Sequence, residues 1–550
     1  MLNDINKFLL LLQDKKFNEA RTFIDSQNIE IDNGNKYALK GILELEQKNY
    51  DQAIQYLKKA SFIFPKNFAH NFNLAIAMGK KQQISDAIKQ FKICISNNYR
   101  KEDSFLGLTE LLIIKKKFNL AIKILLNIKN FNEKIYYQLS FLYKQTNSNQ
   151  LAEKYILLAL DKNPENINSL FLYAEVLRKL GKNKISIEIY NKILEINPNL
   201  KLTLVNIANC YGEIEMLHES IKFFNKYQTD DPNNIDVNYY DSQMKLKIGQ
   251  FENKVFSNFD NRFFISERTV KQYYNINQKL WTGNYIDKLL VWSEQGIGDH
   301  IFFSKHLEEI SSKVKNLIFL TSPRLVNLFK NYFYNKSNNN IKIDTLDNKI
   351  EDFDAHLPAG SIMRIINYNP KQNLRKASAF LKPKKEDNVF FSKHIDHKVL
   401  NIGLSWKSSN NKEIHRNIEF KTIMNSLNKN IKASFYNLQF DLNNDEIEEA
   451  KKNNLIFFNN LDYKKDIDKV ASIIDNLDIV VTIQNTTAHL SCALNKKTYL
   501  LLPQGSRWYW GSENIDQWYK VATIFKQNKL FDWNEVLKLV ERKIKNEQKL

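Results

Sequence analysis

Residues 479–503, IVVTIQNTTAHLSCALNKKTYLLLP, decide the fold of the C-terminal half of this chain. Ile479 to Ile483 are apolar and mostly β-branched, which predicts a buried parallel strand. A short polar turn follows from Gln484 to Thr487, in which Asn485, Thr486 and Thr487 are all residue types that cap helices. Ala488 to Leu494 are predicted to form a short helix, and Thr498 to Leu502 a second buried strand. The stretch is therefore predicted to be a βαβ unit.

This unit places a helix N-terminus at the carboxyl edge of a parallel sheet, where ligands of open α/β sheets bind. The backbone N–H groups and the dipole of a helix N-terminus favour an anion such as phosphate. His489 lies one turn into the predicted helix, where it either contacts a ligand or has a structural role. An ordinary βαβ unit with a polar loop accounts for the same residues, so the pattern alone leaves both interpretations open.

Patterns of strand and helix alternate through the rest of this half. Strands are predicted at residues 289–293, 317–321, 341–345, 355–357, 401–406, 434–438 and 455–457. Helices are predicted at residues 301–310, 323–329, 418–427, 446–451 and 467–477. The segment from Lys382 to Lys385 resembles a linker, after which the alternation restarts. Two consecutive parallel α/β halves predict two Rossmann-like domains that face a cleft.

The N-terminal half contains an internal repeat with a small residue, a bulky residue four positions later and another small residue after three more. The first small positions are Ala53, Ala87, Ala121, Ala152, Ser186 and Ser220, spaced by 34 residues except for one interval of 31. These positions share one helical face and let two helices approach closely. The pattern resembles the tetratricopeptide repeat, in about seven copies, and predicts an α-solenoid over residues 1–252. Such arrays bind extended peptides or partner domains, or act as spacers.

Residues 253–285 connect the two halves and are rich in aromatic side chains, among them Phe256, Phe259, Phe263 and Trp281. We expect a capping helix whose aromatic side chains seal the last repeat against the following domain. The predicted domains are then the solenoid, this capping region, a first Rossmann-like half at 286–385, and a second Rossmann-like half with C-terminal helices at 386–550.

Composition narrows the functional classes. The chain has 550 residues, is 43% hydrophobic and 26% charged, and carries a net charge of +19. Its lysines are interspersed with acids, and no basic run alternates with stacking aromatic residues, so no specific nucleic-acid partner is expected. Cys94, Cys210 and Cys492 are far apart, which argues against a zinc cluster or a disulfide framework. The sequence contains no apolar stretch of about 18 residues, so no transmembrane segment is predicted. We expect a cytoplasmic protein.

A glycine-rich turn ends the first strand of the α/β half. Gly296 and Gly298 let the backbone approach a ligand closely, and Asp299 follows in the first turn of a helix. Asp299 is our candidate for a general base that takes a proton from an acceptor hydroxyl. A carboxylate is also favourable at a helix N-terminus for structural reasons alone. The dinucleotide fingerprint is not matched, because an acidic residue about 20 positions further on is missing.

A second set of candidate residues follows the strands of the last half. Ser405 and Lys407 come directly after one strand, and Arg416 lies on the same loop. Lysine or arginine at this edge can neutralise a diphosphate leaving group, although most basic loops are only solvated. Gln439 ends the next strand, where it either contacts a nucleobase or ribose or caps the turn. No histidine or acidic set has metal-ligand spacing, so no cofactor is expected.

Three segments together resemble a known pattern. They are residues 293–299 (SEQGIGD), residues 403–406 (GLSW) with Arg416 downstream, and residues 477–494, which begin LDIVV and end TAHLxxAL. With these segments, the chain resembles tetratricopeptide-repeat proteins whose C-terminal domain is similar to the heptosyltransferase family of glycosyltransferases. Helical repeats before a catalytic GT-B fold also occur in protein O-linked N-acetylglucosamine transferases.

The resemblance implies a GT-B-like pair of Rossmann-like domains that transfers a sugar from a nucleotide-sugar donor, with inversion and without metal. It implies that Asp299 is the base, that Arg416 contacts the donor phosphate and that residues 484–489 form the donor loop. The family's aspartate in that loop is Gln484 here, which leaves the donor and the activity open. The acceptor would be a protein or glycan presented by the repeats. The alternative is a non-catalytic repeat scaffold with a degenerate transferase-like domain, and a nucleotide-binding protein of other chemistry is a third hypothesis.

Overall fold

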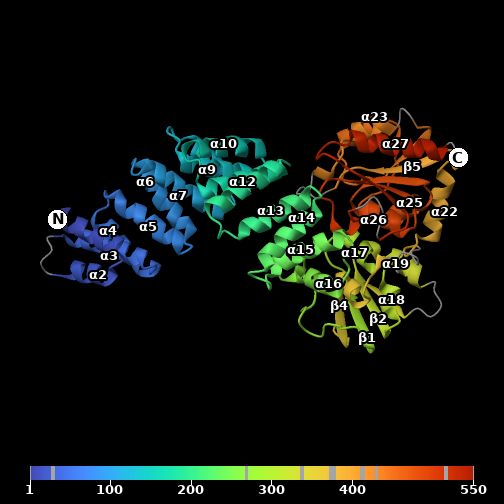
Figure 1. Cartoon of the computed structure of the whole chain (residues 1–550), viewed down its shortest axis with the longest axis horizontal. Helices are drawn as coiled ribbons and strands as arrows, with labels where there is room; N and C mark the ends of the chain where they lie inside the picture. The colour runs from blue at the N-terminus through green and yellow to red at the C-terminus, as the bar shows by residue number, and fades with distance from the viewer. Residues whose placement is uncertain are drawn as a thin grey trace. The chain divides into compact units, whose positions relative to one another are not determined.

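The computed structural model describes residues 2–26, 31–266, 270–334, 340–370, 379–408, 415–427, 431–512 and 518–548. The chain forms two compact units, residues 1–199 and 200–550 (Figure 1). The described part of the first unit is built from helices. The second unit begins with further helical hairpins and continues into two parallel sheets. The division between the units falls inside the array predicted for residues 1–252.

The repeats form consecutive helical hairpins. In the first unit these are α1 (Leu2–Gln13), α2 (Phe17–Asp25), α3 (Asn33–Glu46), α4 (Tyr50–Ile63), α5 (Phe68–Lys80), α6 (Ile84–Ser96), α7 (Lys101–Ile114), α8 (Phe118–Leu126), α9 (Glu133–Gln145), α10 (Asn149–Lys162), α11 (Ile167–Lys179) and α12 (Asn183–Ile196). The second unit continues with α13 (Leu202–Glu213), α14 (Leu217–Gln228), α15 (Ile235–Lys247) and α16 (Asn253–Phe259). The predicted helical repeats are confirmed.

The small residues of the repeat lie where two helices of a hairpin touch. All six first small positions, from Ala53 to Ser220, are fully buried. Where the small residue is serine, its hydroxyl donates to a backbone carbonyl of the neighbouring helix: the Oγ–O distance is 2.7 Å from Ser186 to Ala174 and 2.7 Å from Ser220 to Ala208. Serine therefore replaces alanine without leaving a buried polar group unpaired.

The predicted capping helix is α16, which continues into the 3-10 helix η1 (Asp260–Phe263). The ring of Phe259 lies 5.9 Å from Tyr239 of α15 and 5.1 Å from Trp508 of the α/β region, measured between ring centroids. The aromatic side chains thus pack the last hairpin against the α/β region.

The first sheet has the order β3-β2-β1-β4, and all its strands are parallel. Its strands are β1 (Ile286–Trp292), β2 (Val314–Thr321), β3 (Ile341–Thr345) and β4 (Ala355–Pro358). The connecting helices are α17 (Ile297–Ser304), α18 (Leu307–Ser311), α19 (Val326–Phe333) and α20 (Ile362–Ile365). A single helix was predicted for residues 301–310; it is broken instead, and His306 at the break buries its ring 5.0 Å from Tyr368.

The second sheet has the order β10-β9-β8-β5-β6-β7 and is also parallel. Its strands are β5 (Leu400–Ser405), β6 (Ala433–Asn437), β7 (Leu455–Ile456), β8 (Ile479–Ile483), β9 (Thr498–Leu502) and β10 (Ala522–Lys526). Its helices are α22 (Lys385–His394), α23 (Phe420–Leu427), α24 (Asn444–Lys452), α25 (Ile467–Asp475), α26 (Thr486–Ala493) and α27 (Asn534–Gln548). The βαβ unit predicted at residues 479–503 is β8-α26-β9.

Parallel sheets with connecting helices confirm the α/β prediction for the C-terminal region. Strand β10 was not predicted from the sequence; it pairs with β9 alone at the edge of the sheet, and its side chains are mostly half-buried. Strands with both faces buried give a clearer apolar run than edge strands. Among the described residues, no helix is both long enough and apolar enough to cross a membrane.

Candidate functional site

Both sheets have a point at which the strand order reverses. In the second sheet the chain runs from β5 to β6 and β7 on one side and then returns to β8 on the other side of β5. Ligands of open α/β sheets bind at the carboxyl ends of the two strands that flank such a point. Ser405 ends β5, and Gln484 follows β8 directly. Several of the predicted donor residues therefore meet at the switch point of the second sheet.

Ser405 lies at the centre of a buried network of hydrogen bonds at this switch point. Its Oγ accepts from Asn485 Nδ2 at 2.8 Å and contacts Thr487 Oγ1 at 3.4 Å. Asn485 is the N-cap of α26 and accepts from the Ala488 amide through Oδ1 at 3.3 Å. Thr486 is the first residue of that helix. The network fixes the start of α26 against the end of β5.

Gln439 holds the loop after β5. Its Oε1 accepts from the amides of Trp406 and Lys407 at 2.9 and 2.8 Å and from Ser405 Oγ at 3.2 Å. Its Nε2 donates to the Phe440 carbonyl at 2.8 Å. Both ends of this buried amide are engaged within the protein, which corresponds to the turn-capping alternative of the sequence analysis.

Arg416 brings a cation to the switch point. Its side chain is almost completely buried. Nη1 donates to the Gln484 carbonyl at 3.1 Å and Nη2 donates to Ser408 Oγ at 2.7 Å. Both of these acceptors are neutral groups. A buried cation beside a helix N-terminus suits an anionic group.

Lys407, on the same loop, forms an ion pair with the first turn of α24. Its Nζ donates to both carboxylate oxygens of Glu446, at 2.6 and 2.7 Å. Burial alone would raise the pKa of Glu446, but the hydrogen bond from Lys407 and the backbone amide of Asn443 lower it. The Lys407 cation is thus already paired with an ionised carboxylate at the start of α24.

The glycine-rich turn of the first sheet contacts α26. A Cβ added to Gly298 would lie 2.9 Å from Cδ2 of His489 and 3.6 Å from the Cα of Thr486. Asp299 follows Gly298, and its Oδ2 accepts from the Gly296 amide at 3.1 Å as the capping residue of α17. Its side chain is partly exposed. The first turns of α17 and α26 therefore lie against each other, and Asp299 belongs to that contact region.

His489 is buried beneath the first turn of α26 rather than exposed beside it. Only 2% of its surface is accessible. Its Nδ1 lies 2.8 Å from Tyr519 Oη, and its ring stacks at 4.8 Å on Trp510. Burial lowers the pKa of His489 to about 3, so the ring is neutral at pH 7. This geometry corresponds to the structural role that the sequence left open.

The burial of His489 predicts a pH dependence of stability. The folded chain keeps this ring neutral down to about pH 3, whereas the unfolded chain binds a proton near pH 6.5. Stability is therefore fully present above pH 6.5 and falls as the pH decreases toward 3. We expect His489 to contribute a loss of about 1.4 kcal/mol per pH unit in this window.

His489→Gln, which keeps a polar partner for Tyr519, should reduce this slope by the contribution of one proton. Urea unfolding at several values between about pH 7.5 and pH 5 measures it. A residual slope is expected in the variant, because burial also lowers the pKa of His300 to about 4. An identical slope in the variant and the wild type would contradict the prediction.

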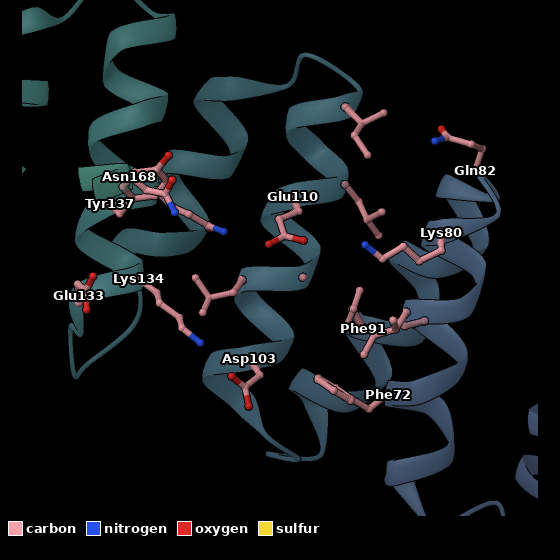
Figure 2. A pocket seen from close by; sticks show the side chains of 18 of the residues that line it. Phe72, Lys80, Gln82, Phe91, Asp103, Glu110, Glu133, Lys134, Tyr137 and Asn168 are labelled. Atoms are coloured by element: carbon pink, nitrogen blue, oxygen red, sulfur yellow. The ribbon is translucent and has the colours of Figure 1, made fainter. Parts of the chain in front are cut away.

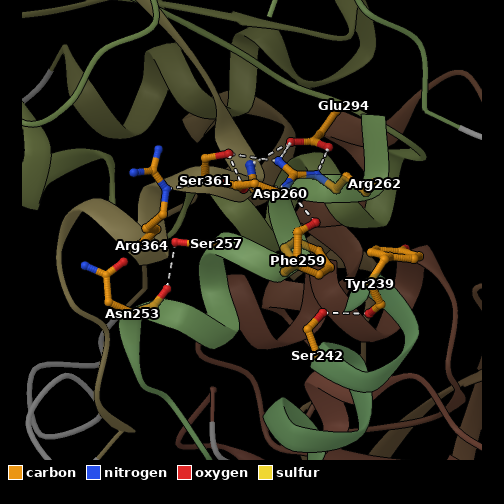
Figure 3. A network of polar contacts seen from close by, with 11 residues as sticks. Tyr239, Ser242, Asn253, Ser257, Phe259, Asp260, Arg262, Glu294, Ser361 and Arg364 are labelled. Carbon is orange, nitrogen blue, oxygen red and sulfur yellow. Dashed lines mark hydrogen bonds and ion pairs between the residues drawn. The ribbon is translucent and has the colours of Figure 1, made fainter. Parts of the chain in front are cut away.

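The switch point of the first sheet, between β1 and β4, is filled by an ion pair (Figure 3). Arg262 of η1 is fully buried and donates to Glu294, with Nε–Oε2 at 2.6 Å and Nη2–Oε1 at 2.7 Å. Glu294 Oε1 also accepts from the Gly360 amide at 2.9 Å. A Cβ added to Gly360 would lie 2.7 Å from that oxygen, so this close approach requires glycine.

Asp260 extends this network toward the surface. Its Oδ1 accepts from Arg262 Nη1 and from Ser361 Oγ, both at 2.7 Å, and its Oδ2 accepts from Arg364 Nε at 2.7 Å. The capping region thus supplies the residues that occupy the carboxyl edge of the first sheet. The sequence analysis did not predict this network; Glu294 within the segment SEQGIGD was its only local signal.

Two of the pockets lined by described residues combine aromatic with polar side chains. One, of about 320 Å³, lies at the carboxyl ends of β6 and β7; its lining includes Asn437, Gln439, Phe457 and Tyr463. The other, of about 810 Å³, lies in the first unit between successive hairpins (Figure 2). Its lining combines aromatic and charged side chains, including Phe72, Lys80, Phe91, Asp103, Glu110, Glu133, Lys134 and Tyr137. Most of these come from the first helices of their hairpins.

Comparison with known proteins supports the repeats. The family model described as "Tetratricopeptide repeat" matches residues 37–67, 133–166 and 167–200. The chain therefore contains tetratricopeptide repeats, as predicted. It is 26% identical over 202 residues to the TPR repeat-containing protein MJ1428 of Methanocaldococcus jannaschii, a match that covers 34% of this chain and 35% of that protein. The match thus spans about a third of that relative's length.

Several solved structures are also similar. YrrB, described as a TPR protein with an unusual peptide-binding site, has a TM-score of 0.29 and 15% identity, covering 33% of this chain and 95% of that one. The C-terminal part of a TPR repeat-containing protein from Cytophaga hutchinsonii has a TM-score of 0.36 and 16% identity, covering 42% and 96%. PilF of Pseudomonas aeruginosa has a TM-score of 0.34 and 15% identity, covering 38% and 97%.

Proposed function

We propose that this chain is a glycosyltransferase that moves a sugar from a nucleotide-sugar donor to a protein or glycan acceptor held by the helical repeats. The observation that carries the proposal is the meeting of Arg416, Ser405 and the N-terminus of α26 at the switch point of the second sheet. The turn that carries Asp299 contacts the same helix. The proposed diphosphate site and the proposed base would then lie on neighbouring helix starts.

The donor diphosphate would bind at the start of α26. The helix dipole and the amides of its first turn favour negative charge, and Arg416 adds a buried cation. These groups would carry the charge that develops on the leaving diphosphate. We propose a GT-B-like arrangement in which this leaving-group stabilisation requires no metal ion.

The nucleoside would occupy the pocket at the carboxyl ends of β6 and β7. Its volume of about 320 Å³ lies at the lower end of the range for small-molecule sites. Its lining combines aromatic rings, such as Phe457 and Tyr463, with polar side chains such as Asn459 and Asn460. Aromatic faces and a few polar groups are the usual means of holding a base and a ribose.

Asp299 would act as the base on the opposite side of the sugar. A carboxylate that removes the acceptor's proton while the diphosphate leaves gives a single displacement with inversion. The Gly296 amide holds Oδ2 of Asp299, and the side chain is partly exposed, so an acceptor hydroxyl could reach it.

The repeats would bind the acceptor or another protein partner. Tetratricopeptide arrays stack their hairpins and bind extended segments along one side. The pocket of about 810 Å³ between hairpins of the first unit combines aromatic residues with charges of both signs. An interaction role for the repeats stands independently of any catalysis.

A non-catalytic scaffold is the second candidate, and specific observations favour it. Lys407 is paired with Glu446, and the side chain of Gln439 is bonded within the protein. Gln484 replaces the aspartate that the heptosyltransferase resemblance implies, and its Oε1 accepts from the Arg507 amide at 3.1 Å. A domain that has lost donor binding would retain such internal contacts.

Nucleotide binding distinguishes the two candidates. We expect one member of a panel of UDP, GDP, ADP and CMP and their sugar conjugates to raise the melting temperature of the full chain. At a concentration about 100 times Kd, a ligand stabilises the folded state by about 2.7 kcal/mol. Arg416→Gln should abolish this shift, whereas Arg542→Gln, on the exposed surface of α27, should leave it unchanged. Stabilisation by no member of the panel would favour the scaffold.

A further inference from the structure

The loop after β9, residues 503–507, is held by the last helical hairpins. Lys247, at the end of α15, donates from Nζ to the Ser506 carbonyl at 2.7 Å and to Glu215 Oε1 at 2.7 Å. Glu215 Oε1 also accepts from the Gly505 amide at 3.1 Å. Lys247 is only 2% exposed. A buried lysine and a carboxylate of the repeats thus bond the backbone of two consecutive residues of the loop, Gly505 and Ser506.

The contact between this loop and the repeats requires glycine at position 505. Gly505 has a φ of +73°, and a Cβ added there would lie 3.3 Å from the carbonyl oxygen of Glu213, the last residue of α13. A side chain at Gly505 would be strained for both reasons. The backbone of the loop at Gly505 therefore packs closely against the end of α13.

The same loop continues into the proposed donor site. The Arg507 amide donates to Gln484 Oε1 at 3.1 Å, and the Gln484 carbonyl accepts from Arg416 Nη1 at 3.1 Å. Gln484 lies between the end of β8 and the N-cap of α26. Hydrogen bonds and consecutive residues thus lead without interruption from α15 to the buried guanidinium.

We propose that Lys247 and Glu215 are positioning residues for the phosphate site at Arg416. They fix the loop at residues 503–507, the loop fixes the side chain of Gln484, and the Gln484 backbone orients Arg416. Residues that hold a ligand-contacting group in place affect affinity without touching the ligand. The last helical hairpins are then a part of the site rather than a separable spacer. The identity of the ligand, a nucleoside diphosphate, rests on the proposed function.

Lys247→Met tests the proposal in the full-length protein, since methionine keeps much of the buried volume and removes the donor. Lys182→Met is the matched control: Lys182 pairs with Glu153 at 2.6 Å between two hairpins of the first unit. For the nucleoside diphosphate that stabilises the wild type, we expect Lys247→Met to raise Kd on the order of tenfold. Lys182→Met should leave Kd unchanged, and isothermal titration calorimetry measures both.

Hydrogen–deuterium exchange without ligand tests the connection independently of the function. Lys247→Met should speed exchange of peptides that cover residues 484–490 and 503–508, and Lys182→Met should not. If the wild type binds no nucleotide, the proposed function fails and this exchange experiment still decides whether the connection exists. Faster exchange confined to residues 503–508, or no change in either segment, would overturn the proposal.

Glu215→Gln serves as a milder variant if Lys247→Met does not fold. Its amide oxygen can still accept from the Gly505 amide and Lys247, but it lacks the negative charge. We expect faster exchange of the same two segments, by a smaller factor. Wild-type exchange in residues 484–490 of this variant, with faster exchange limited to the repeats, would also overturn the proposal.

Discussion

Replacing Arg262 by alanine is expected to destabilise the second unit by about 3–5 kcal/mol. The guanidinium is fully buried and forms two hydrogen bonds to Glu294, which is itself fully buried. Its loss leaves a buried carboxylate that still accepts from the Gly360 amide but has lost its guanidinium partner, and desolvation of an uncompensated charge is costly. All seven tryptophans lie in the second unit, so tryptophan fluorescence during urea unfolding reports on this unit.

The double variant Arg262→Met with Glu294→Gln provides the control. It removes both charges together, while the glutamine oxygen can still accept from the Gly360 amide. Because a buried ion pair contributes little net stability over a neutral replacement, the double variant should be clearly more stable than Arg262→Ala. A loss below about 1 kcal/mol in the single variant, the value typical of exposed ion pairs, would show that Glu294 is accommodated without its partner.

Replacing Asp299 by asparagine is expected to reduce turnover by a factor of about 10² to 10⁴. An amide cannot accept the proton of an acceptor hydroxyl. It can still accept from the Gly296 amide, which is the contact that caps α17, so folding and donor affinity should be retained. Release of nucleoside diphosphate, from the sugar nucleotide that the melting panel identifies and with peptide and glycan acceptors, is the measurement.

Asp287→Asn is the matched control, because Asp287 is an exposed aspartate on β1 of the same half. It should leave turnover unchanged. Turnover at the wild-type rate in Asp299→Asn would remove Asp299 from the role of base while leaving the proposed diphosphate site intact. Loss of donor affinity in that variant would instead assign Asp299 to binding.

Local patterns predicted the elements well. The spacing of the small residues from Ala53 to Ser220 predicted the hairpins, and the apolar runs predicted β8, α26 and β9 nearly to their ends. Periodicity predicts these elements because side-chain direction repeats every few residues in helices and strands, so the local sequence contains the pattern. The break between α17 and α18 was not predicted, because it depends on the packing of the His306 ring against Tyr368, which lies far away in the sequence.

The candidate site was predictable only in part. The carboxyl ends of β5 and β8 were expected to carry the polar residues that lie there, since the alternation of strands and helices implies a parallel sheet. The partners of those residues were not predictable. Gln439 bonds backbone amides of the loop after β5, more than 30 residues before it. Lys407 pairs with Glu446, and His489 is covered by Trp510 and Tyr519.

By itself, the residue pattern of this chain determined that tetratricopeptide-like hairpins precede an α/β region, and which turns lie at the carboxyl edges of its sheets. Only the tertiary structure decided that Arg262 fills the first switch point, that His489 is buried, and that Lys247 holds the loop leading to Gln484. The physical reason is the range of the interactions. Secondary structure follows from side chains a few positions apart, whereas ion pairs and burial depend on residues that the fold alone brings together.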